Sequence, residues 1–179
     1  MSNKKHFQIS QQAVEKLAVR FGTPLLVLSL DEIKKNYKVL KKYMPRVKIH
    51  YAIKANPHPE ILRVMADMGS CFDVASDGEI RTMHDMGVDG GRLIYANPVK
   101  TGVGLEACRS CGVRKMTFDS ASEIDKIKKQ CPDATVLLRL RIDNSSAHVD
   151  LNKKFGAARE NALALMQQAK EAGLDMAGI

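Results

Sequence analysis

Strand-like segments recur along this chain at a nearly constant interval, and that interval limits the possible folds more than any other feature. The segments are rich in β-branched and apolar residues and begin near residues 47, 71, 93, 115 and 135, 20 to 24 residues apart. A helical pattern follows each of the first four, over residues 59–68, 78–86, 104–110 and 121–130. This alternation predicts an α/β fold with a parallel sheet and right-handed crossovers. The steady period favours a (β/α) barrel over a doubly wound sheet.

The fifth strand–helix unit departs from this period. Residues 135–142 are a predicted strand, residues 143–156 are an extended polar stretch, and a helix is expected over residues 157–172. A sixth strand is expected from residue 175. Because an insertion after a barrel strand lies on the catalytic face of such folds, we expect the polar stretch to border the active site or a subunit contact.

The first 29 residues stand outside the repeat. Residues 10–21 have a helical pattern, and residues 23–29 (TPLLVLS) have the composition of a strand. We therefore divide the chain into residues 1–29 and residues 30–179, the latter being the first part of a barrel. Five strand–helix units and one further strand do not close an eight-stranded barrel, so we expect the chain to be a fragment.

Charge, hydropathy and cysteine content exclude several classes of protein. The net charge is +8, from 28 basic and 20 acidic residues, but the basic residues are scattered and no aromatic stacking motif accompanies them, so no nucleic-acid partner is expected. No long apolar run is present, so no membrane partner is expected, and the lack of a signal-peptide core predicts a cytoplasmic protein. Four cysteines are too few for a disulfide scaffold, and the single pair Cys108 and Cys111 does not suffice for a metal site.

Lys54 is the residue with the clearest chemical meaning. It ends the predicted first strand, in the sequence YAIKAN of residues 51–56. An ammonium group at the end of a buried strand costs free energy unless something neutralises it. Condensation with an aldehyde cofactor to a Schiff base is one solution, and a desolvated lysine is suited to that reaction. The alternative is a strand-end lysine whose ammonium simply reaches water.

Five ordered motifs favour the first of these interpretations. They are residues 51–56 (YAIKAN), 72–76 (FDVAS) with Glu79, 94–100 (IYANPVK), 117–120 (TFDS) and 154–156 (KFG). From about residue 23 to residue 179, the chain resembles the N-terminal portion of the pyridoxal-phosphate-dependent ornithine/lysine decarboxylases, which have an alanine-racemase-like fold. The resemblance implies a partial (β/α)8 barrel of the pyridoxal-phosphate-binding type in which Lys54 carries the cofactor. It also implies a second, all-β domain, to which residues 1–29 belong.

The same resemblance implies three more residues of the cofactor site. It places Asp73 beside the Lys54 Schiff base, where a carboxylate favours the protonated imine; capping of the next helix is the alternative role. Glu79 lies in the first turn of that helix, so its role is either at the helix start or in the cofactor pocket. Arg139 and Arg141 share one face of a strand, and the resemblance puts Arg139 near the cofactor ring.

Residues 97–100 form a loop that the family keeps on the catalytic face, although a turn signal alone would explain it. Other cofactor contacts are implied beyond residue 179. They are a histidine that stacks on the ring, a glycine-rich phosphate loop, an acid at the pyridine nitrogen, and a cysteine and an aspartate from a partner subunit.

The resemblance finally implies an activity. Pyridoxal 5'-phosphate acts as the electron sink when an amino acid loses its carboxylate, and the ornithine/lysine branch makes putrescine or cadaverine for polyamine biosynthesis. We expect a small amino-acid substrate and a homodimer. The alternatives are a diaminopimelate or arginine decarboxylase, a noncatalytic regulatory relative, and a small single-domain cofactor carrier, against which the predicted strand at residues 23–29 argues.

Overall fold

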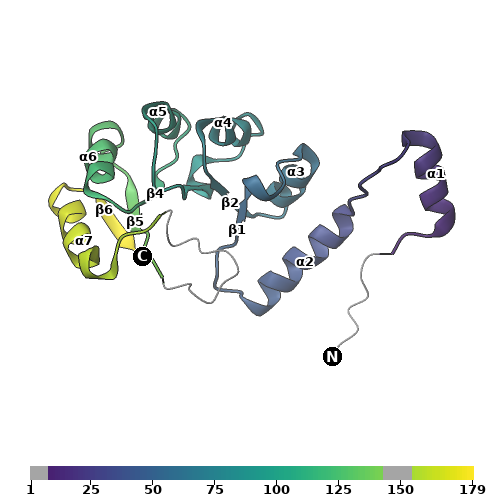
Figure 1. The fold of residues 1–179 in the computed structure, drawn as a ribbon, viewed down its shortest axis with the longest axis horizontal. Coiled ribbons are helices and arrows are strands. Elements are labelled where there is room, and N and C mark those ends of the chain that lie inside the picture. The colour runs from purple at the N-terminus through teal and green to yellow at the C-terminus, as the bar shows by residue number, and fades with distance from the viewer. Residues whose placement is uncertain (1–7, 143–154) are drawn as a thin grey trace. The chain divides into compact units, whose positions relative to one another are not determined.

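The computed structural model describes residues 8–142 and 155–179 (Figure 1). Contacts within the chain divide it into two compact units, Met1–Val47 and Lys48–Ile179. The family-based boundary between residues 29 and 30 is a different division and stays a prediction.

The first unit contains two helices, α1 (Gln11–Phe21) and α2 (Leu30–Tyr43). Each begins at a serine whose hydroxyl oxygen accepts a backbone N–H of the first turn: Ser10 from Ala13 at 3.3 Å and Ser29 from Glu32 at 3.2 Å. These bonds satisfy amide groups that have no partner inside the helix. The helix predicted over residues 10–21 is therefore confirmed.

Residues 22–29 do not form the predicted strand in this structure. They are extended between α1 and α2, and in the described part of the chain no neighbouring strand is hydrogen-bonded to them. A strand is defined by its ladder of hydrogen bonds to a second strand, so apolar composition alone does not produce one. The assignment of residues 1–29 to a second β domain stays a prediction.

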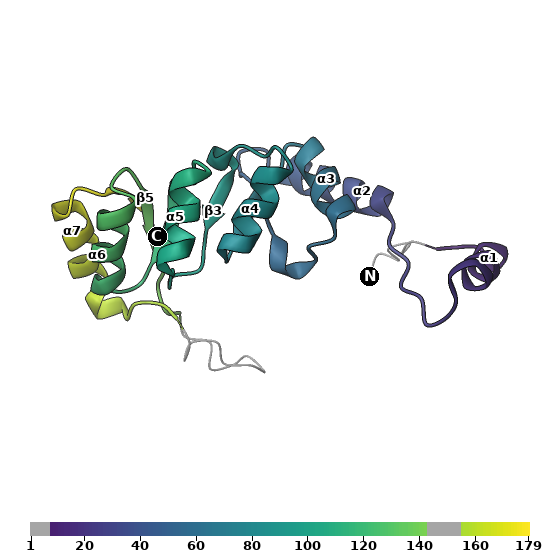
Figure 2. The same cartoon turned by 90° about the horizontal axis from the view of Figure 1, so that it is seen from above.

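The second unit is a parallel sheet whose strands follow one another in chain order, β1-β2-β3-β4-β5-β6. The strands are β1 (His50–Ala52), β2 (Cys71–Val74), β3 (Leu93–Tyr95), β4 (Lys115–Phe118), β5 (Thr135–Leu138) and β6 (Asp175–Gly178). The connecting helices are α3 (Pro59–Asp67), α4 (Asp77–Asp85), α5 (Gly102–Ser110), α6 (Ala121–Gln130) and α7 (Ala162–Glu171). These helices lie along the outer side of the curved sheet, and α4, α5 and α6 lie side by side (Figures 1 and 2). One-sided winding distinguishes a barrel from a doubly wound sheet, so the predicted α/β barrel architecture is confirmed.

The core of this unit lies between the sheet and its helices. In β2, Phe72 and Val74 are fully buried, whereas the alternate residues Cys71 and Asp73 are only partly buried. Strands β4 and β5 repeat this alternation. Since successive side chains of a strand point to opposite faces, the buried set packs under the helices and the other set faces the inside of the curve. Each fully buried large side chain contributes about 1.5–3 kcal/mol to folding.

Three element boundaries differ from the sequence prediction by three residues or more. The fifth strand was predicted over residues 135–142, but β5 ends at Leu138, so Arg139 and Arg141 follow the strand rather than belong to it. The first strand begins at His50 rather than near residue 47, because its partner β2 begins at Cys71, which is in register with His50. The last helix begins at Ala162 rather than at residue 157, because Ala157 forms a parallel bridge with Leu140 and so has extended rather than helical backbone.

All four cysteines are free thiols, and Cys108 and Cys131 are buried. Burial raises the pKa of the Cys108 thiol to about 12, so this side chain stays neutral and packs as a small apolar group. Among the described residues, no helix is both long enough and apolar enough to cross a lipid bilayer.

Candidate functional site

Lys54 lies immediately after β1, in a single 3-10 turn formed by Ile53–Ala55. Ile53 is only 1% exposed and anchors the turn in the core, while the Lys54 side chain is exposed. The hydroxyl of Tyr51 donates to the Asn56 carbonyl oxygen at 3.1 Å, which fixes the chain on the far side of the turn. The lysine is therefore held by its neighbours just past the end of β1, close to the strand-end position that the sequence predicted.

Asp73 lies on the next strand, on the inward face. Its register partner in β1 is Ala52, two residues before Lys54, and its partner in β3 is Ile94. Burial raises the pKa of the Asp73 carboxyl group, and the positive charges of Lys54, His50 and Arg139 act in the opposite direction. The carboxylate is thus the shared neighbour of three basic side chains.

Arg139 follows β5 and is held on both sides. Its backbone N–H donates to the Phe118 carbonyl at 2.8 Å, and its carbonyl accepts from the Ala157 N–H at 2.8 Å. Its guanidinium carbon lies 5.3 Å from the centre of the Phe155 ring, within cation–π range. The short segment at residues 155–157 therefore fixes both the backbone and the charged group of Arg139.

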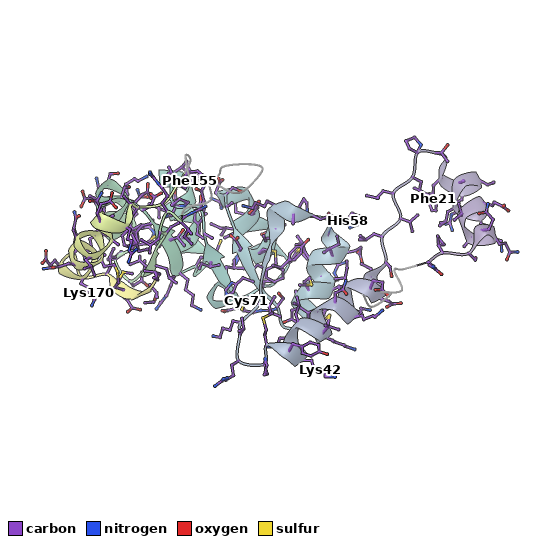
Figure 3. All side chains as sticks on the ribbon, turned by 60° about the horizontal axis from the view of Figure 1, so that its bottom comes forward. Phe21, Lys42, His58, Cys71, Phe155 and Lys170 are labelled. Carbon is purple, nitrogen blue, oxygen red and sulfur yellow. The ribbon has the colours of Figure 1, made fainter. Side chains whose placement is uncertain are left out.

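A cavity of about 370 Å³ joins these residues. It is lined by Lys54, Asp73, Ala75, Ala96, Asn97, Arg139 and Phe155. All come from segments at or just after the carboxyl ends of β1, β2, β3 and β5, or from the segment that pairs with residue 140. Figure 3 shows Phe155 near the edge of the sheet opposite Cys71, the residue at which β2 begins. The carboxyl edge of a parallel sheet is where barrel enzymes place their active sites.

Glu79 lies in the first turn of α4 and does not line this cavity. The Ser76 hydroxyl oxygen accepts the Glu79 N–H at 3.2 Å, and the Glu79 carboxylate accepts the Ala75 N–H at 2.6 Å. This reciprocal pattern resembles a capping box. Glu79 thus supports the cavity through Ala75, and its direct contact with a cofactor stays a prediction.

Several other predicted or neglected residues have clear positions. Phe155 and Asn97 line the cavity. The sequence interpretation gave Phe155 no role, and it placed Asn97 in a loop that is either on the catalytic face or a simple turn. The Arg141 guanidinium is exposed, lies 3.5 Å from the Gly156 carbonyl oxygen and does not line the cavity. Of the polar stretch 143–156, only residues 155 and 156 are described; residues 143–154, including His148 and Lys154, lie outside the described residues. The available signal for Phe155 was an aromatic residue directly before a glycine, at the end of the predicted insertion on the catalytic face.

Comparison with known proteins connects this cavity to a family. The family model for the pyridoxal binding domain of pyridoxal-dependent decarboxylases matches residues 30–179. This chain belongs to that family. The lysine/ornithine decarboxylase of Selenomonas ruminantium is 51% identical over 175 residues, which are 98% of this chain and 44% of that protein. The chain thus spans less than half the length of this curated relative.

Solved structures agree with this assignment. A crystal structure of SrLDC with pyridoxal phosphate and cadaverine has a TM-score of 0.88 and 48% sequence identity, and the match covers 98% of this chain and 44% of that one. The lysine/ornithine decarboxylase of Vibrio vulnificus, complexed with cadaverine, has a TM-score of 0.82 and 31% identity over 94% of this chain and 45% of that one. The predicted family, fold and cofactor class are confirmed by these matches.

The residues of the cavity fit pyridoxal phosphate. Cofactor pockets commonly measure roughly 300–1,000 Å³, and the cavity of this chain falls within that range. Lys54 offers the primary amine that an aldehyde requires. Arg139 offers a cation that complements an anionic group of the cofactor. Asp73 offers a carboxylate beside a nitrogen that would be positively charged. Ala75 and Ala96 have the smallest side chains in the lining.

Proposed function

We propose that the protein containing this chain decarboxylates ornithine, lysine or both, with pyridoxal phosphate as cofactor, and releases putrescine or cadaverine. The observation that carries the proposal is the cavity in which Lys54, Asp73 and Arg139 meet at the carboxyl edge of the sheet. The 51% identity with a lysine/ornithine decarboxylase supports this choice of substrates.

In this proposal the Nζ atom of Lys54 would hold the cofactor and would yield it to the amino group of the substrate. Pyridoxal phosphate, when bound, accepts the electron pair left on the substrate Cα after carbon dioxide departs. Lys54 lies on an exposed turn whose ends are anchored by Ile53 and Tyr51, so its amine can move while its backbone stays in place. A nucleophile that must first hold and then release a group needs this combination.

Asp73 stabilises positive charge on the nitrogen that Lys54 presents. Burial disfavours the ionised carboxylate and raises its pKa, whereas nearby cations favour ionisation. A positively charged nitrogen held next to Asp73 would lower that pKa and would itself be stabilised. Arg139 contributes a fixed cation on the other side of the cavity, oriented by Phe155.

We also propose a cytoplasmic homodimer. The free state of all four cysteines supports a reducing compartment. The dimer rests on the family resemblance, in which a partner subunit completes the site.

The decisive experiment is a decarboxylation assay on the full-length protein. The wild type with pyridoxal phosphate is expected to release carbon dioxide from ornithine or lysine, and Lys54→Ala is expected to release none above background. Lys48→Ala is the matched control, because Lys48 is an exposed lysine outside the cavity. Arginine and diaminopimelate are tested in parallel. Release from one of these two alone would replace the proposed substrate, and release from none would favour the noncatalytic alternative.

A second measurement tests the attachment residue independently of turnover. Borohydride reduction of the loaded protein, followed by peptide mass mapping, is expected to find the pyridoxyl group on Lys54. A pyridoxyl group on Lys48 or Lys100 instead would contradict the assignment.

A further inference from the structure

Lys100 is a lysine whose charged end is completely buried. It follows β3, in the segment that leads to α5, and its side chain is 0% exposed. Burial lowers the pKa of its ammonium group, while the negative charge of Glu123 acts in the opposite direction. A side chain with four methylene groups could have reached water, so its burial calls for a specific set of partners.

Three backbone carbonyl oxygens provide these partners. The Lys100 ammonium donates to Asn97 at 3.1 Å, to Pro98 at 3.1 Å and to Thr117 at 2.5 Å. An ammonium has three N–H groups, so each has one acceptor. Asn97 and Pro98 belong to the loop after β3, and Thr117 belongs to β4. One side chain therefore ties the end of one strand to the next.

A buried carboxylate compensates the charge. Glu123, on α6, is 3% exposed, and its oxygen lies 3.4 Å from the Lys100 nitrogen. The same carboxylate accepts the Lys100 backbone N–H at 3.3 Å and forms an ion pair with Lys126. Lys126 in turn donates to the Lys100 carbonyl oxygen at 2.6 Å. The cluster of Lys100, Glu123 and Lys126 thus connects α6 to the loop after β3.

This loop is also a wall of the cavity. Ala96 and Asn97 line the cavity, and the Thr117 hydroxyl donates to the Ala96 carbonyl oxygen at 2.8 Å. Lys100 itself does not line the cavity. Its contacts with the Asn97 carbonyl and with Thr117 therefore lie directly behind the surface that a cofactor would meet.

Stability alone does not account for such a cluster, because apolar residues of similar size often replace a buried ion pair with no loss of stability. We propose that Lys100 is a positioning residue: its ammonium fixes the Ala96–Asn97 wall of the cofactor cavity by holding the carbonyls of two neighbouring strand ends. This inference rests on the proposed function. When the three carbonyl oxygens lose their common donor, the Ala96–Asn97 wall is expected to change shape. Pyridoxal phosphate is then expected to bind less tightly.

The test is the double substitution K100M/E123L in the full-length protein, which removes the ion pair but keeps apolar volume in its place. The apoprotein is expected to unfold at a temperature no lower than the wild type. The Kd for pyridoxal phosphate is expected to rise at least about tenfold, since small displacements in a site have large effects. The circular dichroism of the bound cofactor is expected to change as well. A Kd within twofold of the wild-type value, together with an unchanged circular dichroism spectrum, would overturn the proposal.

Lys126→Met is the matched control. It removes the outer cation of the cluster but leaves the Lys100 ammonium and its three carbonyl partners, so cofactor affinity is expected to stay within twofold of the wild type. An equal loss of affinity in Lys126→Met would overturn the proposal, because charge rather than positioning would be responsible. If K100M/E123L does not fold, K100Q/E123Q is measured by the same criteria. A wild type that fails to bind pyridoxal phosphate would contradict the proposed function itself.

Discussion

Asp73 shows how the chemistry of a single residue opposes the stability of the fold. Its carboxyl group lies on the inward face of β2, near Lys54, His50 and Arg139, and burial is the dominant influence on its pKa. A raised pKa means that the folded chain holds the proton more tightly than the unfolded chain does. Folding is therefore opposed by this residue at any pH above both pKa values, where the carboxylate is charged in the folded and the unfolded chain.

The substitution Asp73→Asn is accordingly expected to stabilise the cofactor-free protein at pH 7. The side chain is only partly buried, so after allowance for solvent screening the gain should be below about 1 kcal/mol. The gain should disappear as the pH falls below the pKa of an unfolded aspartate, about 3.9, because both states then hold the proton. Urea unfolding of both proteins at a series of pH values measures this difference.

Asp125→Asn is the control for that series, because Asp125 is an exposed aspartate in the middle of α6. It should change stability little at any pH. A loss of stability in Asp73→Asn at pH 7 would show that the nearby cations outweigh burial.

At the scale of elements, α4 depends on its first turn. The Glu79 carboxylate accepts the Ala75 N–H, and Ser76 accepts the Glu79 N–H. Glu79→Ala should therefore destabilise the protein by about 1 kcal/mol, the usual effect of losing a cap. Glu79→Gln keeps an acceptor oxygen and should retain most of this stability. Thermal unfolding of the apoprotein and cofactor titration are the two measurements. Weak cofactor binding in both variants would assign Glu79 to the pocket, and weak binding in Glu79→Ala alone would fit a helix-start role.

Gly156 controls the short segment that carries Phe155 to the cavity. Its φ is 103°, a value that favours glycine, and its N–H donates to the Asp119 carboxylate at 2.8 Å. A Cβ at this position would lie 2.7 Å from the Arg141 nitrogen, so the backbone would have to shift. Gly156→Ala should therefore lower the free energy of unfolding and also weaken cofactor binding, because Phe155 and Arg139 would move.

Gly112→Ala is the matched control for this substitution. Gly112 also has a positive φ, 71°, but its Cβ would meet no atom within 4 Å. This control should show only the backbone penalty, about 1–2 kcal/mol, whereas Gly156→Ala should lose about a further 1–3 kcal/mol from overpacking. Denaturant unfolding and cofactor titration of both variants test the difference, and equal effects on both properties would contradict this explanation.

Most elements of the barrel unit could be predicted from the sequence, since local composition and period determine them. The strands that begin at Cys71, Leu93, Lys115 and Thr135 begin as predicted, and α6 occupies the predicted residues 121–130. The largest errors in the predicted elements come from pairing between segments that are distant in the sequence. The first strand is shortened by its partner, the last helix by the bridge at Ala157, and residues 22–29 lack a partner strand in the described part.

At the scale of the whole molecule, some parts of the candidate site could be predicted from the sequence, whereas contacts between distant segments could not. The family resemblance suggested Lys54, Asp73 and Arg139, and the structure brings these three residues to one cavity. Sequence could not reveal the contact of Phe155 with Arg139, or the buried pair of Lys100 and Glu123, because each joins segments far apart in the chain. Their roles in binding a cofactor stay predictions.

Residues 1–179, expressed alone, are expected to release no carbon dioxide from ornithine or lysine and to associate. In the described part of the chain, β1 and β6 each have a neighbouring strand on one side only. Free strand edges promote association, and exposed apolar side chains such as Leu26, 89% exposed, add to it. Size-exclusion chromatography beside the full-length protein tests this expectation. A monomeric and active fragment would show that the working site lies entirely within these residues.

The alternation along β2 has a consequence for how proteins of this architecture diversify. Phe72 and Asp73 are adjacent in the sequence, yet one packs under the helices and the other faces the cavity. Substitutions on the inward side can change what is bound while the outward side continues to hold the strand against its helices. Selection for folding and selection for chemistry thus act on alternate residues of the same short strand. Either set of residues can change during evolution while the other set stays the same.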